Sequence, residues 1–201
     1  YSRALLFIAA FLGVYLEITK HGGFGMLLYY TVLSNLLVTL FTAYLLLKMR
    51  GDDNSWQNPG ILRLKGGVTM SIMITCVIYH FMLAPIATDF YRLENFLCHY
   101  IVPLWFLADT LLFDKNRQYK WFDPIVWTVL PLLYMGFAIL NGLVLKMNIP
   151  NAKDNPFPYF FLNANKYGWG FVFRWAATIF VAYMISGYLF YLVKNIKKSK
   201  K

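Results

Sequence analysis

Charged residues are scarce in this 201-residue sequence, and acidic residues are the scarcest. Only 14% of the chain is Asp, Glu, Lys or Arg, and 9 residues are acidic, whereas 59% is hydrophobic. A soluble domain averages about 25% charged and roughly 45–50% apolar residues. The apolar residues form runs of about twenty, the length that crosses a bilayer core. The composition therefore excludes a soluble domain and indicates an all-α, polytopic integral membrane protein.

Cysteine is also rare. The two cysteines, Cys76 and Cys98, both fall inside apolar runs and lack the spacing of a metal site. We interpret them as small buried hydrophobic side chains. They give no information on compartment, and we expect neither a metal nor a cofactor.

Six apolar runs predict six transmembrane helices in a single domain that covers residues 1–201. The first run has no small-residue cleavage site, so we interpret it as a spanning helix rather than a signal peptide. Polar or glycine-containing segments separate the runs. The expected spans are 3–20, 24–48, 66–88, 94–113, 122–146 and 170–194.

The basic residues lie almost wholly at helix ends and in connections, which is the pattern of topology signals rather than of a nucleic-acid site. Most lie on the side of the two termini: Arg3, Lys48, Arg50, Arg63, Lys65, Lys115, Arg117, Lys120, Lys194, Lys197, Lys198, Lys200 and Lys201. The opposite side carries Lys20, Arg92, Lys146, Lys153 and Lys166. The positive-inside rule therefore predicts both termini in the cytoplasm, and we expect a bilayer but no nucleic acid as partner.

Polar side chains inside spans usually face a bundle interior and often serve function. On the predicted topology most of them fall in the outer half of the membrane: Glu17, Thr31, Asn35, His80, His99, Asn141 and Arg174. Asp109 instead falls in the inner half near Lys115, where we expect it to face the cytoplasmic interface. The convergence of polar groups from several helices predicts a cavity in the outer half.

Thr31 and His99 are the candidate reactive pair. Thr31 lies seven residues into the second expected span and His99 five residues into the fourth, at comparable depth. A threonine hydroxyl becomes nucleophilic when a neighbouring base removes its proton, and neutral histidine suits that role. The ordinary alternative is that the threonine bonds its own helix and the histidine is a satisfied polar residue.

Four further residues are candidate oxyanion or substrate-binding donors: Asn35, His80, Asn141 and Arg174. For Arg174 the alternative is a structural ion pair with Glu17. Pro103 follows His99 by four residues and cannot donate to its carbonyl, so we expect the helix to loosen there, as also at Pro85 and Pro131. The loop at 148–168 is rich in proline and aromatic residues. It predicts either an interfacial lid over the bundle mouth or an ordinary aromatic belt.

Several short phrases carry a family resemblance. They are Tyr-Thr-Val-Leu-Ser-Asn-Leu at 30–36, His-Tyr-Ile-Val-Pro at 99–103, Asp-Thr-Leu-Leu-Phe-Asp at 109–114 and Asn-Pro-Phe-Pro-Tyr-Phe-Phe-Leu at 155–162. With these phrases, the chain resembles a bacterial family of six-span proteins that is similar to the androgen-induced and androgen-dependent membrane proteins of animals. The animal members lack the extended loop around 155–162, and His80 has no counterpart in the pattern.

The resemblance implies a six-helix bundle with cytoplasmic termini in a bacterial plasma membrane. It also implies an intramembrane threonine hydrolase that cleaves fatty acid esters of hydroxy fatty acids. On that analogy the nucleophile carries over to Thr31 and the histidine base to His99.

Two other functions fit the same residues. A non-catalytic lipid-binding or transport protein would use the polar pocket to hold a head group, with His99 and Arg174 contacting the ligand. A haem or quinone electron carrier would use His80 and His99 as axial ligands on facing helices. The leading hypothesis is hydrolysis of a membrane lipid or fatty acid ester. The sequence gives no indication of oligomeric state.

Overall fold

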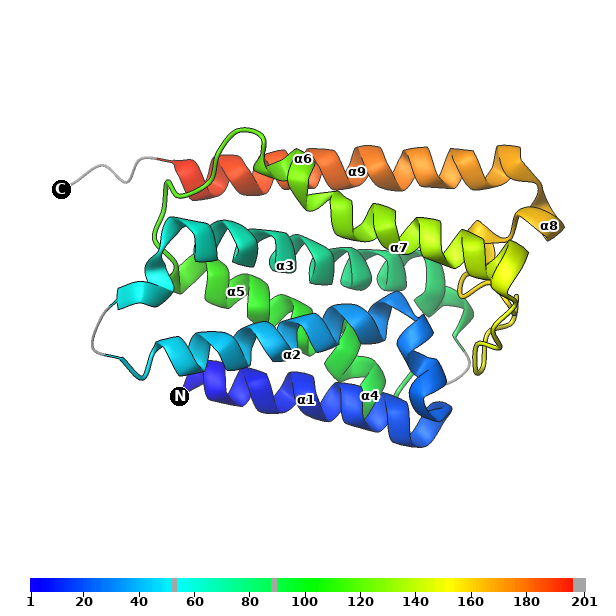
Figure 1. The fold of residues 1–201 in the computed structure, drawn as a ribbon, viewed down its shortest axis with the longest axis horizontal. Helices are drawn as coiled ribbons and strands as arrows, with labels where there is room; N and C mark the ends of the chain where they lie inside the picture. Colours follow the sequence, from blue (N-terminus) through cyan, green and yellow to red (C-terminus); the bar gives the residue numbers. More distant parts are fainter. Residues whose placement is uncertain (52–53, 88–89, 197–201) are drawn as a thin grey trace.

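The computed structural model describes residues 1–51, 54–87 and 90–196, and these form a helical bundle without β-strands (Figure 1). Six of its helical stretches are long and apolar enough to cross a membrane: Ser2–His21, Tyr30–Lys48, Pro59–Ile86, Leu93–Phe113, Asp123–Leu145 and Trp169–Asn195. The chain thus has the architecture of a multi-pass membrane protein. The first span begins and the last span ends at the same end of the bundle, which we call the terminal end. Lys197, Lys198, Lys200 and Lys201 of the predicted basic tail lie outside the described residues.

Three spans are single α-helices, and three are interrupted. The single helices are α1 (Ser2–His21), α2 (Tyr30–Lys48) and α9 (Trp169–Asn195). The third span joins α3 (Pro59–Ile78), a π-helical segment (Tyr79–Leu83) and a 3₁₀ turn (Ala84–Ile86). The fourth joins α4 (Leu93–Phe96), a π-helical segment (Leu97–Ile101) and α5 (Val102–Phe113). The fifth joins α6 (Asp123–Trp127), α7 (Val129–Leu140) and a π-helical segment (Asn141–Leu145), and the short α8 (Ala164–Tyr167) precedes α9.

Prolines account for two of these interruptions. Pro85 follows the π-helical segment Tyr79–Leu83, and Pro103 follows the segment Leu97–Ile101. Proline has no N–H to donate, so the preceding turn widens instead of continuing the α-helical ladder. The loosening expected at these two prolines is therefore present. π-Helical turns inside α-helices are frequent at functional sites.

Four spans begin within one residue of the expected position, and two begin further away. The second begins at Tyr30 rather than 24, because Gly22 (φ 152°) and Gly23 (φ 63°) end α1 and a 3₁₀ helix, Gly23–Leu28, follows. The third begins at Pro59 rather than 66. There the Asn58 side chain accepts the N–H of Gly60 at 2.8 Å, and proline suits the first helical turn.

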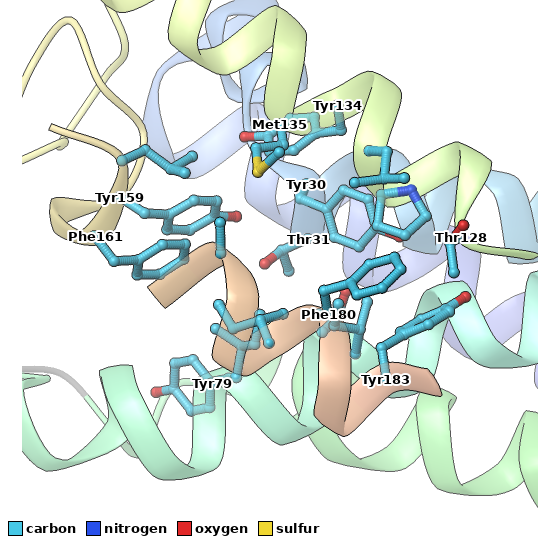
Figure 2. Close-up of a pocket in the computed structure, with 18 of the residues that line it drawn as sticks. Tyr30, Thr31, Tyr79, Thr128, Tyr134, Met135, Tyr159, Phe161, Phe180 and Tyr183 are labelled. Atoms are coloured by element: carbon cyan, nitrogen blue, oxygen red, sulfur yellow. The ribbon is translucent and has the colours of Figure 1, made fainter. Parts of the chain in front are cut away.

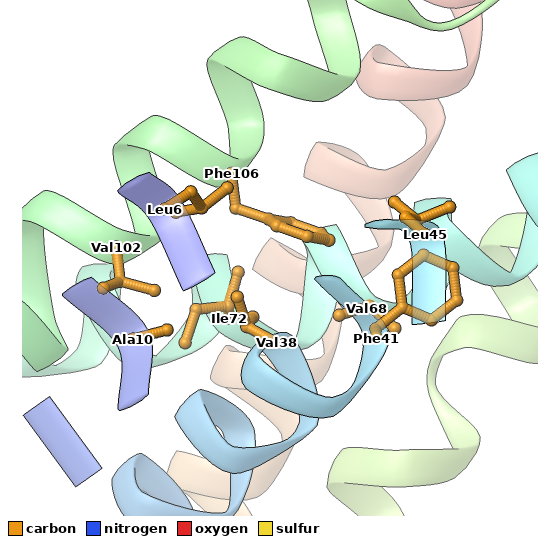
Figure 3. Close-up of a cluster of buried hydrophobic side chains, with 9 residues drawn as sticks. All are labelled: Leu6, Ala10, Val38, Phe41, Leu45, Val68, Ile72, Val102 and Phe106. Carbon is orange, nitrogen blue, oxygen red and sulfur yellow. The ribbon is translucent and has the colours of Figure 1, made fainter. Parts of the chain in front are cut away.

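The largest apolar core joins the first four spans. Its side chains are all almost fully buried, and they come from α1, α2, α3 and α5 (Figure 3). The members are Leu6, Ala10, Val38, Phe41, Leu45, Val68, Ile72, Val102 and Phe106. The two cysteines, Cys76 and Cys98, are also buried and free, as expected. α1 and α9 lie on opposite sides of the bundle, with α6 beside α9 (Figure 1).

A buried charged cluster closes the terminal end. The Arg3 Nε donates to both carboxylate oxygens of Asp109 at 2.9 and 3.0 Å, and Lys65 contacts both Asp109 and Asp114. Lys194 Nζ donates to the carbonyl oxygen of Asp114 at 2.8 Å. Asp109 is only 2% exposed, so the expectation that it faces the cytoplasmic interface near Lys115 is wrong. Its position on the inner face of α5 places it between two cations instead.

Candidate functional site

Thr31 and His99 lie in contact at the end of the bundle opposite the termini, which we call the loop end. Thr31 Oγ1 is 3.3 Å from His99 Nε2, although 68 residues separate them. Thr31 is the second residue of α2 rather than the eighth of a longer helix, because the 3₁₀ helix Gly23–Leu28 and extended Tyr29 precede it. α2 has no side-chain cap. The N–H groups of its first turn lie next to the Thr31 hydroxyl.

The imidazole of His99 is fixed in orientation. Its Nδ1 lies 3.0 Å from the backbone oxygen of Asn95, and a carbonyl oxygen only accepts hydrogen bonds. In the neutral ring Nδ1 therefore carries the proton, and Nε2 presents its lone pair to Thr31. The ring of Tyr79 stacks on the imidazole with centroids 3.7 Å apart. His99 is only 7% exposed, so it lies behind Thr31, away from open space.

Asn35 links the two helices that carry this pair. Its Nδ2 donates to the carbonyl oxygens of Thr31 at 2.8 Å and of Cys98 at 3.0 Å. Because both amide hydrogens are engaged, the candidate role of Asn35 as an oxyanion donor does not fit this geometry. The side chain is completely buried and holds the turn of Thr31 against the turn of His99.

Thr31 lines an apolar pocket of about 100 Å³ between the third, fifth and sixth spans (Figure 2). An apolar cavity of about 150 Å³ is large enough to hold a benzene ring, so this one has room for a short stretch of an acyl chain. Its apolar lining includes Ile74, Ile78, Leu132, Met135, Ile179 and Phe180. Leu132 and Phe180 are also 42% and 43% exposed on the surface of the bundle. The pocket therefore opens sideways between α7 and α9, where lipid would surround the protein.

The loop at 146–168 covers the loop end. Tyr29 Oη donates to the carbonyl oxygen of Pro150 at 2.7 Å, and Asn151 Nδ2 donates to that of His21 at 2.6 Å. Phe157 is 1% exposed and packs against Gly142, where a Cβ atom would lie 2.1 Å from its ring. These contacts hold the loop against the bundle, and Tyr159, Phe161 and Leu162 form the wall of the pocket on this side.

Two other candidate donors lie away from the pocket. His80 is exposed, and its Nδ1 is 3.2 Å from the hydroxyl of Tyr100. Asn141 is 1% exposed; its Nδ2 donates to the carbonyl oxygens of Pro156 and Met147, and its Oδ1 accepts the Met147 N–H. Asn141 thus anchors the loop at 146–168. Neither side chain lines the pocket beside Thr31.

The structure does not bring Glu17 and Arg174 together, so the expected ion pair is wrong. Glu17 is buried in α1 with His21, Arg92 and Glu94 as its electrostatic neighbours. Arg174 is exposed on α9, on the opposite side of the bundle. Because α9 is apolar nearly all round, its sequence gives little sign of which face turns inward. For this reason the sequence-based placement of Arg174 in the cavity is wrong.

Sequence reasoning missed three parts of the site. Asn95 contributes a backbone oxygen, which sequence does not reveal. Tyr79 contributes a ring face to His99, and Tyr159 contributes a wall of the pocket. The aromatic loop at 148–168 was the one available signal for Tyr159. His99 follows Asn95 by four residues, which is about one helical turn. That spacing was the only hint that the Asn95 backbone oxygen contacts His99.

The histidines do not form an axial pair. Both ring nitrogens of His99 face protein groups, Asn95 and Thr31, while His80 faces Tyr100. A shared haem iron would require one free nitrogen from each ring. Within residues 1–51, 54–87 and 90–196, no group of three or more His, Cys, Asp or Glu side chains is placed to hold a metal ion.

Comparison with protein-family models, with curated proteins and with solved structures finds no match to this chain. The assignment of chemistry therefore depends on the geometry around Thr31.

Proposed function

We propose that this protein is an intramembrane lipid ester hydrolase in which Thr31 is the nucleophile and His99 the general base. One observation carries the proposal: the Thr31 hydroxyl lies between the lone pair of His99 Nε2, 3.3 Å away, and an apolar pocket. A nucleophile, its base and a third group that orients the base form the usual arrangement for covalent acyl transfer. The carbonyl oxygen of Asn95 is that third group.

The reaction follows from these positions. His99 Nε2 takes the proton of Thr31 as Oγ1 bonds to the ester carbonyl carbon. When the tetrahedral intermediate collapses, the ester C–O bond breaks, and the proton on Nε2 passes to the leaving alcohol. Water then attacks the acyl-threonine and gives a proton to Nε2, which returns it to Oγ1 as the free acid leaves. The sum is ester plus water giving acid plus alcohol.

The substrate class follows from the pocket and its surroundings. The lining is almost entirely apolar and opens between α7 and α9, so an acyl chain would reach Thr31 directly from the bilayer. The distribution of Lys and Arg supports a cytoplasmic terminal end, which would put the pocket in the outer leaflet of a bacterial plasma membrane. Together with the family resemblance, this favours fatty acid esters of hydroxy fatty acids or similar lipid esters as substrates, with no cofactor.

The direct test is ester turnover by purified protein in lipid nanodiscs, using a panel that includes fatty acid esters of hydroxy fatty acids. Thr31→Val keeps the branched shape and removes the hydroxyl, so we expect turnover to fall by at least ~10³-fold. Thr31→Ser keeps the hydroxyl and should retain measurable activity. A lipid phosphonate should label Thr31 in the wild type and not in Thr31→Val.

Full hydrolytic activity in folded Thr31→Val protein would exclude Thr31 as nucleophile. Thermal unfolding of each variant in the same detergent serves as the control, because it shows whether loss of the contact between Thr31 and His99 destabilises the fold.

The second candidate is a non-catalytic lipid-binding or transport protein, and the apolar character of the pocket is the observation that favours it. In that case Tyr and Thr hydroxyls around the pocket would hold a head group without breaking a bond. Intact lipid that co-purifies with the protein, together with no cleavage of any ester in the panel, would support this function and exclude the hydrolase.

A further inference from the structure

Three tyrosines pack together where the loop at 146–168 meets the bundle. The ring of Tyr159 lies 6.0 Å from that of Tyr29 and 6.4 Å from that of Tyr134, measured between centroids. It also stacks on Phe161 at 5.3 Å with nearly parallel planes. Aromatic neighbours on several sides restrict the ring, so the direction of its hydroxyl is fixed by packing.

The hydroxyls of these three tyrosines have different surroundings. Tyr29 donates to the carbonyl oxygen of Pro150 at 2.7 Å, and Tyr134 donates to that of Leu28 at 2.8 Å. Tyr159 instead lines the pocket with Thr31, and Figure 2 shows its hydroxyl pointing into the pocket on the side of Thr31. It interacts there with the side chains of Thr31 and Tyr134 and with the backbone of Tyr30 and Thr31. The first two hydroxyls hold structure, and the third faces the reacting centre.

We infer that Tyr159 is a further catalytic residue, whose hydroxyl donates a hydrogen bond to the oxyanion formed when Thr31 attacks an ester. This inference rests on the proposed function. The candidate donors named from the sequence do not serve this purpose, because Asn35 has both amide hydrogens engaged and the side chains of His80, Asn141 and Arg174 do not line the pocket. Tyr159 reaches the pocket from the loop at 146–168 and lines it together with Thr31.

Two physical features suit Tyr159 to this role. Burial raises the pKa of its hydroxyl above the usual range of tyrosine, so it keeps the proton that it must donate. The hydroxyl also lies beside the uncapped first turn of α2, whose N–H groups and helix dipole favour negative charge at the same place. A side-chain donor and a helix N-terminus would then stabilise the oxyanion together.

The experiment compares Tyr159→Phe with Tyr29→Phe in wild-type background. Both substitutions remove one hydroxyl from the same aromatic cluster and keep the ring, but Tyr29 does not line the pocket. Loss of an oxyanion donor costs about 10²–10³-fold in kcat. We therefore expect Tyr159→Phe to lower kcat by about that factor with KM nearly unchanged, and to slow phosphonate labelling of Thr31 in parallel. Tyr29→Phe should change kcat by less than about tenfold.

Each other result has a definite meaning. Unchanged or increased kcat in Tyr159→Phe would overturn the inference, an increase indicating that the hydroxyl blocks the oxyanion position instead. A raised KM with unchanged kcat would also overturn it and would make Tyr159 a binding residue. In both cases turnover by the wild type and its loss in Thr31→Val would leave the proposed function standing. If the wild type cleaves no ester and Thr31 takes up no phosphonate, the proposed function and this inference fail together.

Discussion

The terminal end buries a charged cluster, and the loop end holds the uncharged pair of Thr31 and His99 in addition to the buried carboxylates of Glu17 and Glu94. The charged cluster and the uncharged pair are built in opposite ways. At the terminal end, Arg3, Lys65, Asp109 and Asp114 are charged, almost fully buried and bonded to one another. At the loop end, Thr31 and His99 are an uncharged pair, and one of them faces a pocket. Buried charges need full pairing to offset the loss of hydration, so the groups in this cluster bind one another and not a substrate. A neutral pair with one open side is available to a substrate.

The comparison predicts a large effect for His99. Replacing His99 by Ala removes the base at Nε2, and general base catalysis contributes about 10²–10⁴-fold, so kcat for ester cleavage should fall by that factor. The measurement is steady-state turnover in nanodiscs at saturating substrate.

His80→Ala is the matched control for this change. His80 is another histidine within a span, but it is exposed, bonds Tyr100 and does not line the pocket. We expect its turnover to match that of the wild type. Equal losses in the two variants would show that any histidine substitution damages the bundle, and the loop end would then resemble the terminal end in being purely structural.

A second prediction concerns Lys65, which is completely buried between Asp109 and Asp114. Lys65→Met removes a cation that contacts both buried carboxylates. Removing one partner of a buried ion pair costs roughly 3–5 kcal/mol, so the free energy of unfolding should fall by about that amount. Denaturant titration in detergent measures it.

Lys115→Met is the control, because Lys115 is exposed in the connection beside the cluster and should change stability by less than about 0.5 kcal/mol. In Lys65→Met the turnover per folded molecule should stay close to that of the wild type. A selective loss of kcat without loss of stability would contradict the assignment of this cluster to structure.

The helices were the predictable part of this protein, and the reason is the bilayer itself. A span must be about twenty apolar residues long, so run length alone located all six helices. Boundaries failed where local chemistry decides them, as at Gly22 and Gly23, whose positive φ values separate α1 from a 3₁₀ helix, so that α2 begins only at Tyr30. The two glycines were visible in the sequence. The 3₁₀ helix that follows Gly22 and ends before Tyr29 could not be predicted from it.

The site was only half predictable, for a different reason. Thr31 and His99 stood out because polar groups are costly in lipid. Which helix face turns inward is not visible in spans that are apolar all round, so Arg174 was placed wrongly in the cavity. The contributions of Asn95 and Tyr79 could not be predicted either, since one is a backbone oxygen and the other a ring face.

The smallest expected effect concerns the pocket that distinguishes the loop end, and two adjacent alanines of α9 test it. Ala176 lines the pocket, whereas Ala177 is exposed on the same helix. Ala176→Leu fills part of the pocket. One methylene more or less in an apolar pocket changes the ratio of kcat/KM for two substrates by about 10-fold or more. We therefore expect Ala176→Leu to lower kcat/KM for long acyl chains relative to short ones by about tenfold, and Ala177→Leu to leave the ratio unchanged. The ratio is measured with esters that differ only in acyl length. If both variants behave alike, the acyl chain does not occupy this pocket, and the opening between α7 and α9 is not the route to Thr31.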